Sequence, residues 1–483
     1  MIILAMLVIV VMYVEGMLTP SLPSIAGDFH VTISQVSLVL STYLVGGVAF
    51  TPIVGKLGDI YGKKKVLTAI LFIYLAAVFV TGFSPNFTFM VVSRTIQGVG
   101  MAIMPLGMSL VREEFPRDLV PKAQALISAM FGAGFAISLP LGSLVSNDFG
   151  WRVTYHTATP FVFILAIVTI FVIKESRFKR PETKIDIVGA TLLSTVLGLF
   201  VFALSEGPTW GWTSTGILAL FIIGAILMVP LVAYERGYTR KKGEAIVNFK
   251  LLSERNVLVA NLALSISGMA MFLSMQALTY RLELPVPAGF GKSIVDTGLS
   301  LVPFAIGVLA MGPVTGALVS RTGVKPLAIL GAVLSAVGFF MQATLPGYTG
   351  ILIYEFITGA GLSLLNGSMI NFVVLTVHPK DMGLATAMNG TFRSMGSGIG
   401  APVAGSLMST FTASFVIGVG GGLTITRLLP SHLAFTYTFL AASVAFMVSA
   451  IVILYGKEVL GRGQSRVRAS SRSELKAEDA PAQ

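Results

Sequence analysis

Residues 55–65 read GKLGDIYGKKK, a short charged stretch between two long apolar runs. A weaker copy follows 261 positions later, where residues 316–325 read GALVSRTGVK. The same offset aligns residues of the flanking apolar runs, such as Pro52 with Pro313 and Gly98 with Gly359. Because a constant offset over several apolar runs points to a duplication, the sequence predicts a membrane bundle made of two similar halves.

The composition agrees with a membrane protein. Hydrophobic residues make up 54% of the chain, charged residues make up only 11%, and the mean hydropathy is +0.85. Soluble domains contain about 25% charged residues. Fourteen runs reach the length of about 20 apolar residues that a transmembrane helix needs, and none alternates like a barrel strand. We therefore expect an all-α integral membrane protein with fourteen transmembrane helices.

The repeat also divides the chain. Its offset matches the second apolar run with the tenth and the fourth with the twelfth, so two runs (187–205 and 214–234) lie between the halves as an insertion. The predicted parts are an N-terminal six-helix bundle (1–174), a two-helix insert (187–234), a C-terminal six-helix bundle (257–456) and a disordered cytoplasmic tail (457–483) with little to bury.

The net charge of +11 could indicate binding to nucleic acid, but the positions of the 33 Lys and Arg residues indicate membrane topology instead. With the N-terminus inside, the inner connections hold most of them, and the outer connections hold Arg152, Arg281, Lys292 and Arg427. Positive residues favour the cytoplasmic side of a membrane. The sequence thus predicts a multi-pass protein of the cell membrane with both termini in the cytoplasm and no nucleic acid partner.

Other function classes find little support in the sequence. The chain has no cysteine, and its four histidines show no metal-ligand spacing. No nucleophile, metal cluster or phosphate-binding loop indicates an enzyme, and no sizeable soluble domain indicates a receptor, so a non-transporting membrane enzyme or receptor is the weakest alternative. We expect no metal and no cofactor, and nothing in the sequence requires an oligomer rather than a monomer.

Three segments resemble the signatures of one family. The connection between the second and third runs fits its loop signature at Gly55, Leu57, Asp59, Gly62, Lys63 and Lys64. The fourth run resembles its helix 4 signature at Arg94, Gln97, Gly98 and Gly100, and the pair Asp186 and Gly189 resembles the start of its first inserted helix. The chain thus resembles the major facilitator superfamily, and within it the fourteen-helix drug:proton antiporter family, over nearly its whole length.

The resemblance implies a secondary active transporter that works by alternating access and exports hydrophobic or cationic small molecules, driven by the proton gradient. Its partners would be the substrate, protons and the lipid bilayer. Two departures keep proton-coupled metabolite uptake and uniport open. Residues 139–143 read LPLGS where the antiporters have Gly-Pro and a later Gly-Gly, and Glu15 precedes Pro23 by eight positions where the family acid lies nine before its proline.

The charged stretch is a candidate conformational latch made of Gly55, Asp59, Gly62, Lys63 and Lys64. Glycines allow two helix ends to approach. A carboxylate such as that of Asp59 can accept hydrogen bonds from a helix N-terminus or pair with a base. A latch of this kind could hold the inward-closed state, whereas the alternative is that the lysines only fix the topology.

Arg94 and Glu15 are the predicted proton-coupling residues. Arg94 lies about seven residues, or ~10 Å, inside its helix, where a guanidinium needs a cavity or a partner. Glu15 lies at a similar depth in the first helix. Burial and a nearby guanidinium shift a carboxyl pKa in opposite directions, which makes such a pair tunable. The alternative is a permanent ion pair that only joins the two helices.

The offset of 261 relates Arg94 to Glu355, so the two halves carry opposite charges at equivalent sites. The two residues are then expected to face each other across the central path. Glu355 is a candidate for binding a cationic substrate or a proton, for gating through an interhalf salt bridge, or for a polar contact within its own half.

Other polar residues within the runs either line the substrate path or bond neighbouring helices. The candidates for substrate or gate contacts are Gln97, Gln276 and Asn366. Arg393 lies near the middle of its run, where it can face the interface between the halves. Gly134, Pro140 and Gly142 are candidates for flexing of the fifth helix.

Overall fold

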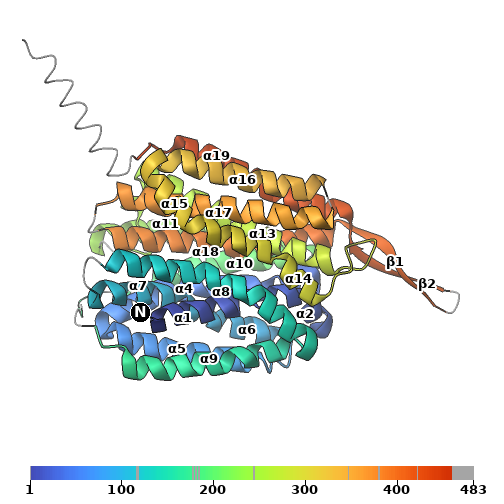
Figure 1. Ribbon diagram of the computed structural model, residues 1–483, viewed down its shortest axis with the longest axis horizontal. Coiled ribbons are helices and arrows are strands. Elements are labelled where there is room, and N and C mark those ends of the chain that lie inside the picture. The colour runs from blue at the N-terminus through green and yellow to red at the C-terminus, as the bar shows by residue number, and fades with distance from the viewer. Residues whose placement is uncertain are drawn as a thin grey trace, which may run out of the picture.

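The computed structural model describes residues 2–115, 119–176, 179, 182, 185–242, 245–345, 347–378, 381–420 and 423–459. Long helices lie side by side in one bundle, roughly parallel or antiparallel to one another (Figure 1). Many large apolar side chains on the outside are exposed, among them Phe171 at 80% and Val229 at 70%. A helix that is apolar on its outer face as well as its buried face is typical of a membrane span.

We use the word rod for a helical segment that runs the length of the bundle, whether it is one helix or several in succession. The first six rods form what we call the N-half. They consist of α1 (Ile2–Gly16), η1 (Thr19–Ser21) and α2 (Leu22–Phe29); α3 (Ile33–Val36) and α4 (Leu38–Tyr61); α5 (Lys63–Thr81); α6 (Phe87–Gln97), η2 (Gly98–Ala102) and α7 (Ile103–Glu114); α8 (Val120–Phe149); and α9 (Trp151–Val172). Three of these rods are built from two or three successive helices.

The insert and the C-half follow. The insert consists of α10 (Ile187–Trp210) and α11 (Thr215–Lys242), and the short helix α12 (Phe249–Leu252) connects it to the C-half. The C-half consists of α13 (Arg255–Glu283); α14 (Ile294–Ser300) and α15 (Val302–Thr322); α16 (Val324–Thr344); α17 (Tyr348–Thr376); α18 (Met382–Thr410); and α19 (His432–Tyr455).

A β-hairpin between α18 and α19 corrects the all-α prediction. Strands β1 (Thr412–Gly420) and β2 (Leu423–Pro430) pair antiparallel, with Thr412 opposite Pro430 at the base. They project from one end of the bundle, which we call the hairpin end and which also holds α2 and α14 (Figure 1). Both strands contain β-branched or aromatic residues, and glycines lie between them, which is a hairpin pattern. The opposite end holds both described termini, and we call it the terminal end.

Among the described residues, twelve helical segments are long and apolar enough to cross a membrane. By this measure the structure supports twelve of the fourteen predicted spans. Helices α8 and α18, which are 30 and 29 residues long, occupy two further predicted positions. Helix α18 is less apolar because it carries Asn389, Arg393 and many small residues. The chain is therefore a multi-pass membrane protein.

The internal repeat is visible in two equivalent close contacts between helices, one in each half. At Gly98 an added Cβ would collide with the carbonyl oxygen of Tyr43, and at Gly359 it would collide with that of Phe304. Both members of the first pair lie 261 positions before their counterparts. The second and fourth rods of each half therefore touch at equivalent points, where only glycine fits.

The insert touches both halves. Helix α10 packs against α11, against α4 of the N-half and against α18 of the C-half. Leu38 and Val48 of α4 form an apolar cluster with Leu193 and Leu197 of α10. At the hairpin end, Gln35 donates hydrogen bonds to both carboxylate oxygens of Glu206 at 3.1 and 3.2 Å. The insert thus contacts the two halves where they meet.

The halves contact each other from the middle of the helices to the hairpin end. There α14 and α15 pack against α8, α13 packs against α2, and α18 packs against α3 and α4. Gln276 of α13 donates a hydrogen bond to the carbonyl oxygen of Ile33 at 3.1 Å. These contacts close the bundle between the halves at the hairpin end.

Candidate functional site

A small cavity of about 30 Å³ lies between the halves. This volume is about that of one water molecule. The N-half contributes Glu15, Leu44, Met101 and Phe135 to its lining, and the C-half contributes Ser267, Gly268, Met271, Phe272, Leu362, Asn366, Arg393, Ser394 and Ser397. Two opposite charges from different halves therefore border one central space.

Glu15 is the acidic residue of this cavity. It lies near the end of α1, is only 7% exposed, and has one oxygen, Oε2, without a hydrogen-bond partner. The cations that act most strongly on its carboxylate are Arg393 of α18 and then Arg94 of α6. The predicted partner Arg94 is thus second to Arg393, which belongs to the opposite half. The sequence placed Arg393 within a span but gave no sign of its closeness to Glu15.

Arg94 is fully buried and bonded within the N-half. Its Nε donates to the carbonyl oxygen of Val39 at 2.9 Å, and its Nη1 donates to Oε1 of Gln97 at 3.0 Å. Its guanidinium also lies 4.7 Å from the centre of the Tyr43 ring. Gln97 in turn donates to Oγ1 of Thr81 at 2.5 Å. These bonds connect α6 with α4 and α5, and they place Gln97 among neighbouring helices, not in the lining of the cavity.

Glu355 occupies the equivalent place in the C-half. It is 3% exposed, and its Oε1 accepts a hydrogen bond from Nε2 of Gln342 at 2.7 Å. Gln342 corresponds to Thr81 by the same offset of 261 positions that relates Glu355 to Arg94. The described bonds of Arg94 and Glu355 therefore lie within their own halves, and the structure does not bring the two side chains together as the sequence predicted.

Asn366 and Gln276 lie at different depths. Asn366 lines the central cavity, and its Oδ1 accepts a hydrogen bond from Ser267 at 3.0 Å. Gln276 lies at the closed hairpin end, where its Nε2 is bonded to Ile33 and its Oε1 is buried without a partner. Asn366 thus lies at the central cavity and Gln276 at the contact between the halves, and their roles in substrate binding and gating stay predictions.

The charged stretch forms a cluster within the N-half. Lys63 is buried, lies 3.6 Å from Asp59 and forms an ion pair with Glu113 at the end of α7. The carboxylate of Glu175 accepts a hydrogen bond from the backbone N–H of Lys64 at 3.1 Å. Of the two predicted partners of Asp59, a helix N-terminus or a basic side chain, the structure shows the basic side chain of Lys63. The sequence missed Glu113 and Glu175 because both lie outside the repeated stretch.

The glycines of this stretch differ in their surroundings. Gly62 adopts a φ of 109°, which favours glycine, where α4 turns into α5. Nothing lies within 4 Å of a Cβ added at Gly55. The described bonds of the stretch stay within the N-half. Its predicted role as a latch that holds the inward-closed state stays a prediction.

The fifth rod packs tightly against the first. A Cβ added at Gly134 would lie 2.6 Å from the carbonyl oxygen of Ile9, and one at Gly142 would lie 2.5 Å from that of Met17. Pro140 lies inside α8 between these two contacts. The two glycines thus permit close contact of α8 with α1, and the flexing of α8 stays a prediction.

Two corrections concern residues at the edges of the predicted parts. Arg281, which we assigned to an outer connection, belongs to α13, is 6% exposed and donates to the carbonyl oxygen of Gln342 at 2.8 Å. The tail predicted to begin at residue 457 starts with bonded residues, because the N–H of Lys457 donates to Asn256 at 2.8 Å. Residues 460–483 of the predicted tail lie outside the described residues.

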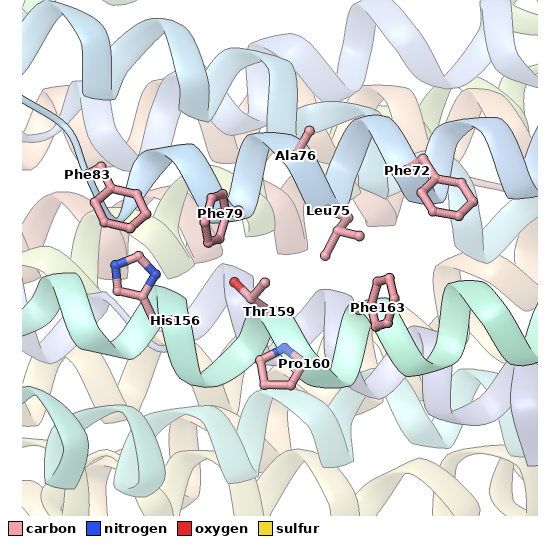
Figure 2. Close-up of a pocket in the computed structure, with 9 residues that line it drawn as sticks. All are labelled: Phe72, Leu75, Ala76, Phe79, Phe83, His156, Thr159, Pro160 and Phe163. Carbon is pink, nitrogen blue, oxygen red and sulfur yellow. The ribbon is translucent and has the colours of Figure 1, made fainter.

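A larger hollow of about 710 Å³ lies between α5 and α9. Figure 2 shows its lining residues, among them Phe79 on α5, Phe83 just after α5, and His156 and Phe163 on α9. Phe83 is 61% exposed and Phe163 is 50% exposed, so this apolar hollow opens on the outside of the N-half. It shares no residue with the central cavity. In a membrane this surface faces lipid.

Within the part of the chain that the structure describes, no group of three or more His, Cys, Asp or Glu residues could hold a metal ion. The central site instead contains one carboxylate, one guanidinium, an amide and hydroxyl groups among apolar side chains.

Comparisons with known proteins agree with this architecture. The chain is 28% identical over 406 residues to an MFS-type transporter of Mycobacterium tuberculosis, a match that covers 82% of this chain and 57% of the relative's length. It is 26% identical to the multidrug transporter protein MdtP of Bacillus subtilis, with 80% and 71% of the two chains covered. It is 25% identical to the tetracenomycin C resistance and export protein of Streptomyces glaucescens, with 80% and 71% covered.

A solved structure has the same fold. The xylose transporter XylE from E. coli, in a partially occluded inward open conformation, matches with a TM-score of 0.63 and 12% identity, over 95% of this chain and 97% of that one. The family model of the Major Facilitator Superfamily matches residues 4–401 and, in a second match, residues 258–477. The chain therefore belongs to the Major Facilitator Superfamily of membrane transporters.

Proposed function

We propose that this transporter exports hydrophobic or cationic compounds in exchange for protons. The observation that supports this most directly is Glu15, a buried carboxylate with one oxygen free of hydrogen bonds in the cavity between the halves. Arg393 reaches the same cavity from the opposite half. Protonation of Glu15 would weaken its attraction to Arg393, so proton binding and the relative position of the halves would be coupled.

The proposed direction and substrate class rest on relatives. The chain is similar to proteins named for multidrug transport and for tetracenomycin C resistance and export. The membrane potential favours inward movement of protons by about 2.3 kcal/mol per charge per 100 mV. An exporter can use this free energy by releasing its substrate outside when it binds a proton there.

The proposed mechanism is alternating access, in which the two six-helix halves rock around the central cavity. Helices α8 and α18 complete fourteen spans, and the terminal end faces the cytoplasm. The contacts between the halves lie toward the hairpin end, which would then be the closed outer side. In this state the substrate path would lead to the cytoplasm.

The topology can be tested directly because the chain contains no cysteine. Val416 of the hairpin is 51% exposed. A Val416→Cys variant in intact cells should react with a membrane-impermeant thiol reagent, whereas a cysteine introduced at Lys457, at the terminal end, should react only after the cells are opened. The reverse pattern would overturn the proposed orientation.

The function is tested in liposomes that contain the purified protein and a pH dye. A proton gradient is imposed, and a panel of lipophilic cations is added. We expect substrate-dependent proton movement in the wild type and its loss in Glu15→Gln. A matched control is Glu206→Gln, which changes a buried carboxylate that Gln35 already satisfies and which lies outside the cavity. Transport of the panel without proton movement would overturn antiport, and no response from correctly inserted protein would favour metabolite uptake.

A further inference from the structure

A pair of buried acidic groups lies at the terminal end of the insert, apart from the central cavity. Asp186 immediately precedes α10 and is 5% exposed, and Glu235 of α11 is fully buried. Each has one oxygen with a partner. Oδ1 of Asp186 accepts from the N–H of Gly189 at 2.9 Å, and Oε2 of Glu235 accepts from the N–H of Val247 at 3.3 Å.

The other two oxygens converge on one point. Oδ2 of Asp186 and Oε1 of Glu235 are buried without a hydrogen-bond partner. A Cβ added at Gly189 would lie 2.6 Å from the first and 2.5 Å from the second, so the two oxygens cannot be more than about 5 Å apart. Two carboxylate oxygens without hydrogen-bond partners therefore border the space that a side chain at position 189 would fill.

Among the described side chains, the groups that act on the pair carry no positive charge. The groups that act on Glu235 are Asp186 and the backbone N–H groups of Val247 and Ile246. Tyr234 and Tyr238 of α11 face Asp186 and are neutral at physiological pH.

Arg236 is the nearest basic residue along α11 whose side chain is described, and its side chain points away from the acidic pair. The guanidinium of Arg236 lies 5.2 Å from the centre of the Phe249 ring, on the connection to the C-half. The buried pair thus lacks an evident counter-charge among the described side chains around it.

Two carboxylates in one buried site resist simultaneous ionisation because each disfavours the charged form of the other. One proton between them removes one negative charge and turns two unsatisfied acceptors into an O–H donor and its acceptor. We propose that Asp186 and Glu235 bind one proton between them, at a site separate from Glu15. The proton comes from the aqueous phase at the terminal end, and its loss leaves both carboxylates charged.

The site is placed to act on the transporter. Helix α10 starts at the pair and packs against one helix of each half. Its far end is joined to α3 through Glu206 and Gln35. A change in the charge of the pair would push the start of α10 and the end of α11 apart and alter the packing of α10 between the halves. The insert would thus sense the proton concentration on this side of the membrane.

The experiment is infrared difference spectroscopy of the full-length protein in lipid nanodiscs, between acidic and alkaline pH. A protonated carboxylic acid gives a C=O band that a carboxylate lacks. We expect Asp186→Asn and Glu235→Gln each to lose the band of one carboxylic acid per chain relative to wild type, because either amide leaves its partner carboxylate with a hydrogen-bond donor. The control Glu206→Gln should leave this band unchanged.

The possible outcomes distinguish a proton shared by Asp186 and Glu235 from no proton at the pair and from a proton on Glu235 alone. If both variants keep the full wild-type band, the pair holds no proton and the proposal fails. If only Glu235→Gln loses the band, Glu235 binds a proton alone and sharing is wrong. Gly189→Ala gives an independent check, since its methyl group would separate the two oxygens and should abolish the shared band. The measurement needs no substrate, so it can succeed or fail independently of the proposed export function.

Discussion

Glu175 and Glu458 make the same contact in the two halves. Each follows the last helix of its half and accepts a hydrogen bond from the first turn of the helix that begins after a glycine turn. Glu175 bonds to the N–H of Lys64 at 3.1 Å in α5, and Glu458 bonds to the N–H of Val324 at 2.9 Å in α16. The glycines of the two turns, Gly62 and Gly323, have φ angles of 109° and 89°. Each carboxylate thus closes its half at the terminal end.

These carboxylates should stabilise each half. A negative charge at a helix N-terminus contributes about 0.3–1 kcal/mol at a surface site and more when partly buried. We expect Glu175→Gln to lower the thermal unfolding temperature in detergent more than Glu458→Gln, because Glu458 is more exposed. The control is Glu254→Gln, since Glu254 precedes α13 without a side-chain hydrogen bond to that helix. An equal effect of all three substitutions would contradict a specific contact.

The buried bond between Glu355 and Gln342 gives a second stability prediction. Gln342→Leu would leave the carboxylate without its donor, which costs about 1–3 kcal/mol for a buried polar group. Glu355→Gln keeps an acceptor oxygen for Gln342 and should cost less. Thermal unfolding of the two variants in the same detergent measures the difference. A larger loss in Glu355→Gln than in Gln342→Leu would show that the charge of Glu355, and not its bond to Gln342, stabilises the C-half.

Constant spacing made part of this architecture predictable. The offset of 261 positions aligned Gly98 with Gly359, and the structure shows that the two glycines make equivalent contacts, because both partners of each contact belong to the repeated helices. Glu175 and Glu458 are 283 positions apart, since the hairpin lengthens the C-half between them, so the same offset does not align them. Local contacts within repeated helices follow the repeat, whereas contacts made by connections do not.

The central site was predicted only in part. Burial of a charged residue in a span marked Glu15, Arg94 and Arg393 as candidates. Whether Arg393 reaches the cavity of Glu15 depends on how α18 is rotated against α1, and one sequence does not fix that rotation. The hairpin was missed because its residues, among them Arg427, were assigned to an outer connection for which no strand was predicted.

Arg393 should matter for coupling more than the sequence suggested. Arg393→Gln removes the cation that acts most strongly on Glu15. We expect substrate-driven proton flux in liposomes to fall at least about tenfold, which corresponds to a loss of about 1.4 kcal/mol, and Arg393→Lys to retain part of it. Arg236→Gln is the control because Arg236 is exposed on α11. Wild-type flux in Arg393→Gln would show that Glu15 works without this partner.

The contact between the halves gives the last prediction. A Cβ added at Gly398 of α18 would lie 3.7 Å from Cβ of Leu44 in α4 and would meet no closer atom. Disulfides have Cβ to Cβ distances of about 3.5–4.5 Å. In a chain without other cysteines, the double variant Leu44→Cys with Gly398→Cys should therefore form an intramolecular disulfide under mild oxidation.

If the halves must separate at this point during transport, the disulfide should abolish substrate-driven flux, and a reductant should restore it. The two single-cysteine variants control for the substitutions themselves and should respond to neither oxidant nor reductant. Formation of the disulfide is checked by mass spectrometry of the digested protein. Flux that continues in fully cross-linked protein would contradict movement of α18 against α4, because the covalent bond holds the two helices at the distance seen in this state.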